Sequence, residues 1–127
     1  MIACVVFDAG AFISVERGGH LVRRYLLLAE AGMLALATSS AVVAQVWRGG
    51  ARQVRLAKLL RSDLVEEIAL DDGESRRIGA LAALTRGTDV VDGHVALITG
   101  DRDAVVVTSD PNDLVGWGVT RSRIVVC

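Results

Sequence analysis

The sequence lacks most of the residues and motifs that identify a function directly. Its two cysteines, Cys4 and Cys127, stand near opposite ends with no spacing typical of a zinc site or a redox motif. Its two histidines, His20 and His94, are too few and too scattered to suggest a catalytic pair, and we expect both to be structural or surface residues. There is no G-x-S-x-G elbow, no P-loop and no G-x-G-x-x-G segment. Hydrolase triads and nucleotide-phosphate sites are therefore disfavoured.

Long apolar runs and a strong net charge are missing too. No apolar stretch reaches the roughly 18 to 20 residues that span a bilayer, and the N-terminus does not read as a signal peptide, so we expect a soluble cytoplasmic protein without membrane contact. The net charge is −1, so any attraction to nucleic acid must come from local patches. A hydrophobic content of 52% over 127 residues predicts one folded domain spanning residues 1–127.

Apolar segments that alternate with helical patterns predict the fold. Uninterrupted apolar runs are typical of strands that are buried on both faces of a parallel sheet. We expect such strands at residues 2–7, 33–38, 64–70, 104–109 and 122–127. We expect helices at residues 20–31, 41–48, 51–61, 72–86, within 87–100, and from 111 onward. The alternation predicts an α/β fold, a three-layer α/β/α sandwich with a central, mainly parallel sheet.

Three aspartates are expected to meet at one edge of that sheet. Asp8 and Asp110 each follow an apolar strand, and ligands of open α/β sheets bind beyond the carboxyl ends of the strands. If those two strands are neighbours, the two carboxylates approach each other. Asp92 lies near the start of a helix, where the helix dipole favours an anion. Carboxylates held together raise one another's pKa, and a hard divalent cation such as Mg²⁺ relieves the repulsion. A bound metal could then activate water for phosphodiester cleavage.

The structural alternative is that each aspartate is a cap or turn residue. Asp89 fits an N-cap, with Asp92 three residues later in the manner of a capping box. The joint pattern of several such residues, rather than any one of them, favours the metal site.

Four segments in this order resemble the PIN-domain family, and within it the VapC-like toxins of bacterial toxin–antitoxin pairs. The segments are VVFDAGAFI, SSAVVAQVWRGG, DVVDGHVAL and VVTSDPNDL. The resemblance implies a metal-dependent endoribonuclease that uses Mg²⁺ or Mn²⁺ to cut structured RNA such as tRNA or rRNA. It also implies a homodimer and a small VapB-like antitoxin as partners. The site residues that it implies are the catalytic and metal-binding Asp8, Asp92 and Asp110, with Asp113 and Asp89 as outer members.

Two positions depart from the family pattern. Gln45 stands where the family usually has a glutamate, and a neutral amide is a poorer ligand for a hard cation. It could still line the pocket and position water or RNA, or lie at its rim. Gly10 stands where the family commonly has a serine or threonine, whose hydroxyl could hold a carboxylate or water. Glu16 could in principle supply a compensating acid, although a solvated helix end is the simpler interpretation.

Basic residues recur every three positions in the segment around residues 51–61. Arg52, Arg55, Lys58 and Arg61 would form a stripe on a helix, and Arg48 lies just before it. The stripe is either a solvated face or a track for RNA phosphates, in which case Arg48, Arg52 and Arg55 are candidate RNA-binding residues.

Three other functions remain to be weighed against the nuclease. A degenerate PIN domain would bind an antitoxin or RNA without cutting, and Gln45 is the residue that favours it. A phosphoaspartyl phosphatase built on Asp8 is disfavoured because Gly10 stands where its second acid would be. A receiver-like domain is disfavoured because Lys58 is the only lysine and lies far from the end of the chain.

Overall fold

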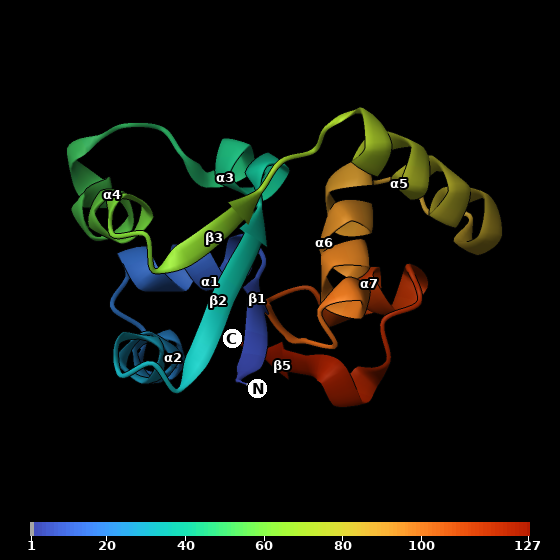
Figure 1. The fold of residues 1–127 in the computed structure, drawn as a ribbon. Coiled ribbons are helices and arrows are strands. Elements are labelled where there is room, and N and C mark those ends of the chain that lie inside the picture. The colour runs from blue at the N-terminus through green and yellow to red at the C-terminus, as the bar shows by residue number, and fades with distance from the viewer. Residues whose placement is uncertain (1) are drawn as a thin grey trace.

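A five-stranded parallel sheet forms the centre of the protein (Figure 1). The computed structural model describes residues 2–127. The strands stand in the order β3-β2-β1-β4-β5, and each neighbouring pair is parallel. They are β1 (Ala3–Phe7), β2 (Leu34–Ser39), β3 (Val65–Ile68), β4 (Val105–Thr108) and β5 (Ile124–Val126). The predicted α/β fold with a parallel sheet is therefore confirmed.

Helices cover the sheet in two groups. Figure 1 shows α1, α2 and α4 together on one side of the sheet, and α5, α6 and α7 together on the other. Within residues 2–127, no helix is long and apolar enough to cross a membrane. The helices are α1 (Ala9–Glu16), α2 (His20–Glu30), α3 (Ser40–Val46), α4 (Val54–Arg61), α5 (Asp72–Thr85), α6 (Val90–Asp101) and α7 (Pro111–Gly116), with two 3₁₀ turns, η1 (Ala51–Gln53) and η2 (Arg121–Arg123).

Helix α1 was not predicted as a helix, and the expected helix over residues 51–61 has a different start. All but two residues of α1 are apolar or Gly, and Ala11, Phe12 and Val15 are buried, so the segment has no polar face to reveal a helical period. The helix expected over residues 51–61 begins as the 3₁₀ turn η1 and becomes α4 only at Val54, after the inward-turned side chain of Gln53. Its amide accepts the backbone N–H groups of residues 48 and 49 and donates to the carbonyl of residue 46.

The core is densest where the central strands meet α1. Val6, Phe7, Val106 and Val107 are fully buried, and each such side chain contributes about 1.5–3 kcal/mol by leaving water. The rings of Phe7 and Phe12 pack edge to face with centroids 5.6 Å apart, which holds α1 against β1.

The topology determines where a site can form. The chain moves outward from β1 through β2 to β3, and then crosses back to place β4 on the other side of β1. Such a switch point leaves a crevice at the carboxyl ends of the strands. Because α6 leads into β4, the start of α6 lies at the same edge as the ends of β1 and β4. The two strands that end before Asp8 and Asp110 are neighbours, since Phe7 pairs with Val107, so the condition for the two carboxylates to approach each other is met.

Candidate functional site

Asp8 is the buried member of the site and is held by two hydrogen bonds. It caps α1, where its Oδ1 accepts the backbone N–H of Ala9 at 2.8 Å. Its Oδ2 accepts the hydroxyl of Thr108, at the end of β4, also at 2.8 Å. Thr108 Oγ1 in turn accepts the backbone N–H of Asp110 at 3.0 Å. One threonine therefore fixes the Asp8 carboxylate and the start of the chain segment that carries Asp110.

Thr108 is a functional residue that the sequence analysis missed. Its hydroxyl does for Asp8 what a serine or threonine at position 10 was expected to do. The signal in the sequence is a threonine at the end of an apolar strand, two residues before Asp110, but only the pairing of β1 with β4 shows that it faces Asp8.

The other four aspartates stand at the starts of two helices. Asp89 is the N-cap of α6 and accepts the N–H groups of Val91 and Asp92 at 2.9 and 3.1 Å, as the capping interpretation predicts. Asp92 lies in the first turn of α6 and is half-buried. Asp110 and Asp113 stand at the start of α7 and are exposed. The helix dipole therefore favours the ionised form of Asp92, whereas its partial burial disfavours that form.

Electrostatic coupling joins all five aspartates. The pKa of Asp92 is raised to about 7, first by burial and then by the charges of Asp89, Asp8, Asp113 and Asp110. Burial also raises the pKa of Asp8, with smaller contributions from Asp110 and Asp89, against the lowering effect of the Thr108 and Ala9 hydrogen bonds. Every charge that shifts these two carboxyls is negative. The arrangement is a cluster of negative charge around Asp8 and Asp92.

The chemistry of this donor set fits a hard divalent cation. Carboxylate oxygens are the ligands that Mg²⁺ takes from proteins, usually one or two together with water. Within residues 2–127, no three His, Cys, Asp or Glu side chains already stand in a metal-holding arrangement. Asp110 and Asp113 are exposed, whereas Asp89 is exposed but already accepts two backbone N–H groups as the cap of α6. Asp8 and Asp92 would be the fixed part of such a site, and Asp110 and Asp113 its adjustable part.

Neither Gln45 nor Glu16 brings a further carboxylate to this cluster. Gln45 lies on α3 and is exposed, and its predicted part in the site stays a prediction. Glu16 accepts a hydrogen bond from the side-chain amide of Gln53 at 2.7 Å, on the side of the sheet where α1 and α4 pack. It is not among the charges that raise the pKa of Asp8 or Asp92. Glu16 is therefore a structural residue.

Gly10 is explained by a close approach of chain segments. A Cβ atom at this position would lie 2.3 Å from Ser109 Oγ and 2.7 Å from the backbone nitrogen of Ser109. Both separations are far below van der Waals contact. A serine or threonine would not fit here, and the hydroxyl at this site comes from β4 instead of α1.

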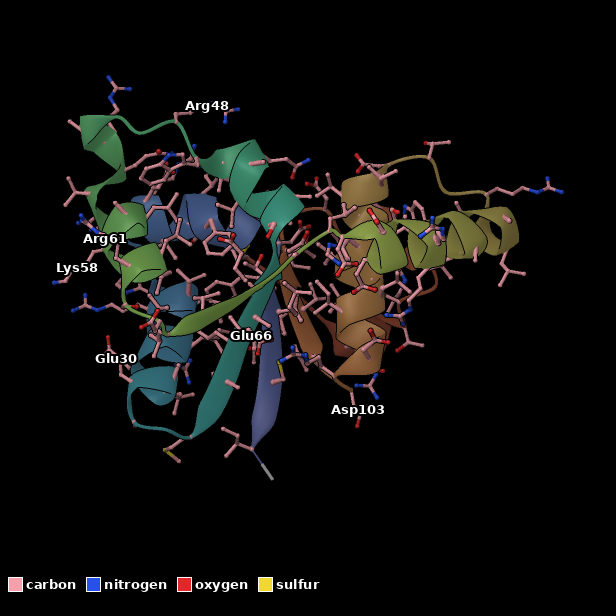
Figure 2. The ribbon with its side chains drawn as sticks, turned by 45° about the horizontal axis from the view of Figure 1, so that its top comes forward. Glu30, Arg48, Lys58, Arg61, Glu66 and Asp103 are labelled. Atoms are coloured by element: carbon pink, nitrogen blue, oxygen red, sulfur yellow. The ribbon has the colours of Figure 1, made fainter. Side chains whose placement is uncertain are left out.

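The basic residues gather on the side of α4 (Figure 2). Arg48 folds back onto the carbonyls of Ala44 and Trp47, and Arg52 is exposed on η1. Arg55 donates to the backbone carbonyl of Glu16 at 3.0 Å. No contact in the structure joins this stripe to the five aspartates within residues 2–127.

A groove of about 690 Å³ lies beside the basic stripe, between α1, α2 and α4. Its wall is partly apolar, with Val15, Val22, Leu26 and Leu59 among the lining residues. Charged groups also line it, namely Arg23, Glu30, Arg55 and Lys58. The groove therefore combines apolar surface with an excess of positive charge.

Two solved structures have a similar fold. VapBC2 from Rickettsia felis, bound to a DNA fragment from its promoter, matches with a TM-score of 0.66 and 16% sequence identity, over 98% of this chain and 97% of that chain. FitAB bound to an IR36 DNA fragment matches with a TM-score of 0.58 and 16% identity, over 96% of this chain and 94% of that chain. No family model and no curated protein matches the sequence. At these identities the likeness concerns the fold.

Replacing Gly10 should reduce stability because the neighbouring backbone cannot move aside. We expect Gly10→Ala to lower the free energy of unfolding by about 2 kcal/mol, the usual cost of forcing a group into a filled space. Adding Ser109→Gly should restore part of the loss, since only the contact with the side chain is removed. Gly100→Ala in α6, where a Cβ would meet nothing within 4 Å, is the matched control and should stabilise slightly. Urea unfolding would measure all three, and an unchanged midpoint for Gly10→Ala contradicts the close approach.

Replacing Asp92 should stabilise the metal-free protein. At pH 8 the ionised carboxylate is partly buried among like charges, and Asp92→Asn removes that cost, so we expect a gain of about 1 kcal/mol after allowing for solvent screening. The gain should shrink as the pH falls from 8 toward 4. Folded Asp92 takes up a proton near pH 7, whereas the unfolded carboxyl stays ionised to about pH 4, so the wild type regains stability over this range. Denaturant unfolding in EDTA would measure it, and the exposed Asp72→Asn should give no comparable gain.

Proposed function

We propose that this chain is a metal-dependent endoribonuclease and the toxin of a VapBC-type toxin–antitoxin pair. The observation that carries the proposal is the group of five aspartates at the carboxyl edge of the sheet, where burial and the neighbouring negative charges raise the pKa of Asp92 and of Asp8. The fold that the chain shares with VapBC2 and FitAB supports it, as does the resemblance of the four sequence segments to VapC-like toxins.

The residues of the site would divide the work between holding the cation and aligning the RNA. Mg²⁺ or Mn²⁺ would supply a Lewis acid for the scissile phosphate and would lower the pKa of a water molecule. Asp8 would be the fixed ligand, since Thr108 and the N–H of Ala9 hold its two oxygens in place while leaving each a further lone pair. Asp92 and Asp110 would complete the ligand set, with Asp89 and Asp113 outside it. Gln45 would position water or RNA without adding charge.

The RNA would be held by the basic residues beside α4. Arg48, Arg52 and Arg55 are the proposed phosphate contacts, and a structured RNA such as tRNA or rRNA is the proposed substrate class. An arginine fork matches phosphate oxygens, and each such contact makes binding dependent on salt.

A VapB-like antitoxin is the proposed protein partner, and the groove between α1, α2 and α4 is its proposed docking surface. The apolar wall would take the apolar face of an antitoxin helix, and the excess of positive charge from Arg23, Arg55 and Lys58 over Glu30 would favour acidic residues on it. A homodimer, expected from the resemblance, is the proposed assembly of the toxin itself.

The alternative is a degenerate domain that binds RNA or an antitoxin without cutting. The specific observation that favours it is the neutral, exposed Gln45 together with the lack of a ready-made metal arrangement within residues 2–127. The two functions differ in what they require of the aspartates, since only the nuclease needs them to bind a cation.

Titrating Mn²⁺ into the metal-free protein, followed by a cleavage assay on tRNA and rRNA, tests the proposed function. We expect the wild type to bind Mn²⁺ and to cut RNA only when metal is present. Asp92→Asn should weaken Mn²⁺ binding at least tenfold and abolish cleavage, because it removes one of the few charged ligands. Asp72→Asn, an exposed aspartate at the start of α5, is the matched control. Gln45→Glu should tighten Mn²⁺ binding if position 45 faces the cation.

Two results would contradict the nuclease. Mn²⁺ affinity that is the same in the wild type and in Asp92→Asn would remove the metal site. Metal binding without cleavage of either RNA would favour the degenerate domain.

The basic stripe makes a separate prediction about salt. We expect the double variant Arg52→Gln and Arg55→Gln to bind RNA more weakly and to reduce the slope of log K against log salt by about 1 to 2, since two phosphate contacts are lost. The control is the double variant Arg76→Gln and Arg86→Gln, which removes the same charge from α5. Fluorescence anisotropy of a labelled RNA at several salt concentrations would measure the slope. An equal change in both double variants would mean that only the net charge matters.

A further inference from the structure

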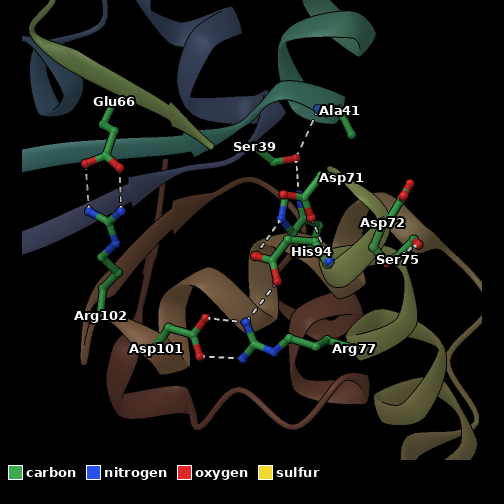
Figure 3. A network of polar contacts seen from close by, with 11 residues as sticks. Ser39, Ala41, Glu66, Asp71, Asp72, Ser75, Arg77, His94, Asp101 and Arg102 are labelled. Carbon is green, nitrogen blue, oxygen red and sulfur yellow. Dashed lines mark hydrogen bonds and ion pairs between the residues drawn. The ribbon is translucent and has the colours of Figure 1, made fainter. Parts of the chain in front are cut away.

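A buried histidine connects three helices to the carboxyl edge of the sheet (Figure 3). His94 in α6 is fully buried, as is Ser39 at the end of β2. The Nδ1 atom of His94 lies 2.7 Å from Ser39 Oγ, and its Nε2 atom lies 3.3 Å from Glu74 Oε1 in the first turn of α5. The expectation that His94 is a structural or surface residue leaves open what it holds in place.

The direction of these hydrogen bonds follows from the chemistry of the partners. A glutamate carboxylate only accepts, so the proton of the imidazole sits on Nε2 and Nδ1 is the acceptor. Ser39 Oγ accepts the backbone N–H of Ala41 at 3.0 Å and donates its own proton to Nδ1. Within residues 2–127, no buried side-chain nitrogen or oxygen lacks a partner. The three groups therefore form one directed chain, Ser39 to His94 to Glu74.

The same geometry excludes a nucleophilic role for this serine. Ser39 is fully buried, so no substrate can reach it. In a hydrolase triad the base faces the serine through Nε2 and the acid through Nδ1, whereas here the two nitrogens are exchanged. These hydrogen bonds therefore have a structural role, which is to hold the helices that they connect.

The hydrogen bonds from Ser39 through His94 to Glu74 join elements that carry residues of the candidate site. Ser39 caps α3, the helix of Gln45, and the backbone N–H of Glu74 is itself held by Asp71 Oδ1 at 2.9 Å. His94 lies two residues after Asp92. Successive helical residues are about 100° apart, so fixing the direction of His94 fixes the direction in which Asp92 points.

Packing acts on this turn of α6 together with the His94 hydrogen bonds, since Val95 and Ile98 are buried in the core. Gly93 has no side chain, and the Trp117 ring lies against it so closely that an added Cβ would be 2.7 Å away. The ion pairs of α6 stand at its other end, where Asp101 binds Arg77 of α5 and the adjoining Arg102 binds Glu66 of β3.

We propose that His94 is a positioning residue for the acid cluster, because its bonds to Ser39 and Glu74 hold the first turns of α6 at the rotation that turns Asp92 toward Asp8. The inference rests on the proposed function, since Mn²⁺ binding by the aspartates is its readout.

Variants of Glu74 test the inference without disturbing the core. Glu74→Ala removes the acceptor of His94, and we expect Mn²⁺ affinity to fall about 5- to 10-fold, within the range typical of outer residues at metal sites. Glu74→Gln keeps an acceptor oxygen but loses the charge, and should bind Mn²⁺ within about twofold of the wild type. Arg77 pairs with both Glu74 and Asp101. Asp101→Ala removes the second of these pairs on the same two helices, and should lower stability while leaving Mn²⁺ affinity unchanged. His94→Phe, which keeps the volume and breaks both bonds, should weaken Mn²⁺ binding further if it folds.

Isothermal titration with Mn²⁺ and denaturant unfolding of each variant give distinct outcomes. Wild-type affinity in Glu74→Ala, or an equal loss in Asp101→Ala and Glu74→Ala, would overturn the inference and leave the proposed function standing. An equal loss in Glu74→Gln would assign the effect to charge alone and would also overturn it. A wild type that binds no Mn²⁺ would overturn the proposed function, and the inference with it.

Discussion

The parallel pairing of β1 with β4 is the interaction on which the site depends. It sets Phe7 beside Val107, so that Asp8 and Thr108 follow at the same level of the sheet. It also puts the reversal of strand order at β1, the point of an open α/β sheet where ligands bind, and the five aspartates stand at that edge. The Phe7–Phe12 packing then brings α1 down beside the end of β4, close enough that position 10 has no room for a side chain.

The repulsion and burial of the aspartates at the site lower the stability of the folded protein. Burying Asp8 and gathering four more aspartates around it raises pKa values, which means that the ionised pocket opposes folding. Hydrogen bonds from Thr108 and Ala9 offset part of that cost at Asp8, and the apolar core beneath supplies the rest. Stability reduced in this way is typical of sites that are shaped for a ligand rather than for the fold.

Local sequence signals predicted the parts of the structure that depend on a few neighbouring residues. The apolar runs ending on Asp8 and Asp110 predicted two strand ends, and the Asp89 cap predicted the start of α6. The aspartates of the proposed site could be named for the same reason, since strand ends and helix starts carry their own patterns. The sequence did not show which strands lie side by side; the structure shows that β1 and β4 are neighbours.

The missed features depend on residues far apart in the chain. Thr108 is 100 positions from Asp8, and Ser39 is 55 positions from His94, so neither contact leaves a periodic trace in the sequence. The reason for Gly10 lies in the backbone of residue 109, and the reason for the late start of α4 lies in the inward turn of Gln53. Helix α1 was missed because apolar residues also stand outside its buried face, as the exposed Ile13 does, and hide the amphipathic period.

The distance along the chain between Asp8 and Thr108 has a consequence for synthesis. Asp8 is made 100 residues before Thr108, and its carboxylate cannot be held in place until β4 has left the ribosome and has paired with β1. The pairing closes a loop of most of the chain, which makes it an entropically costly and slow step. The acidic cluster can therefore take shape only after the chain has been made as far as β4.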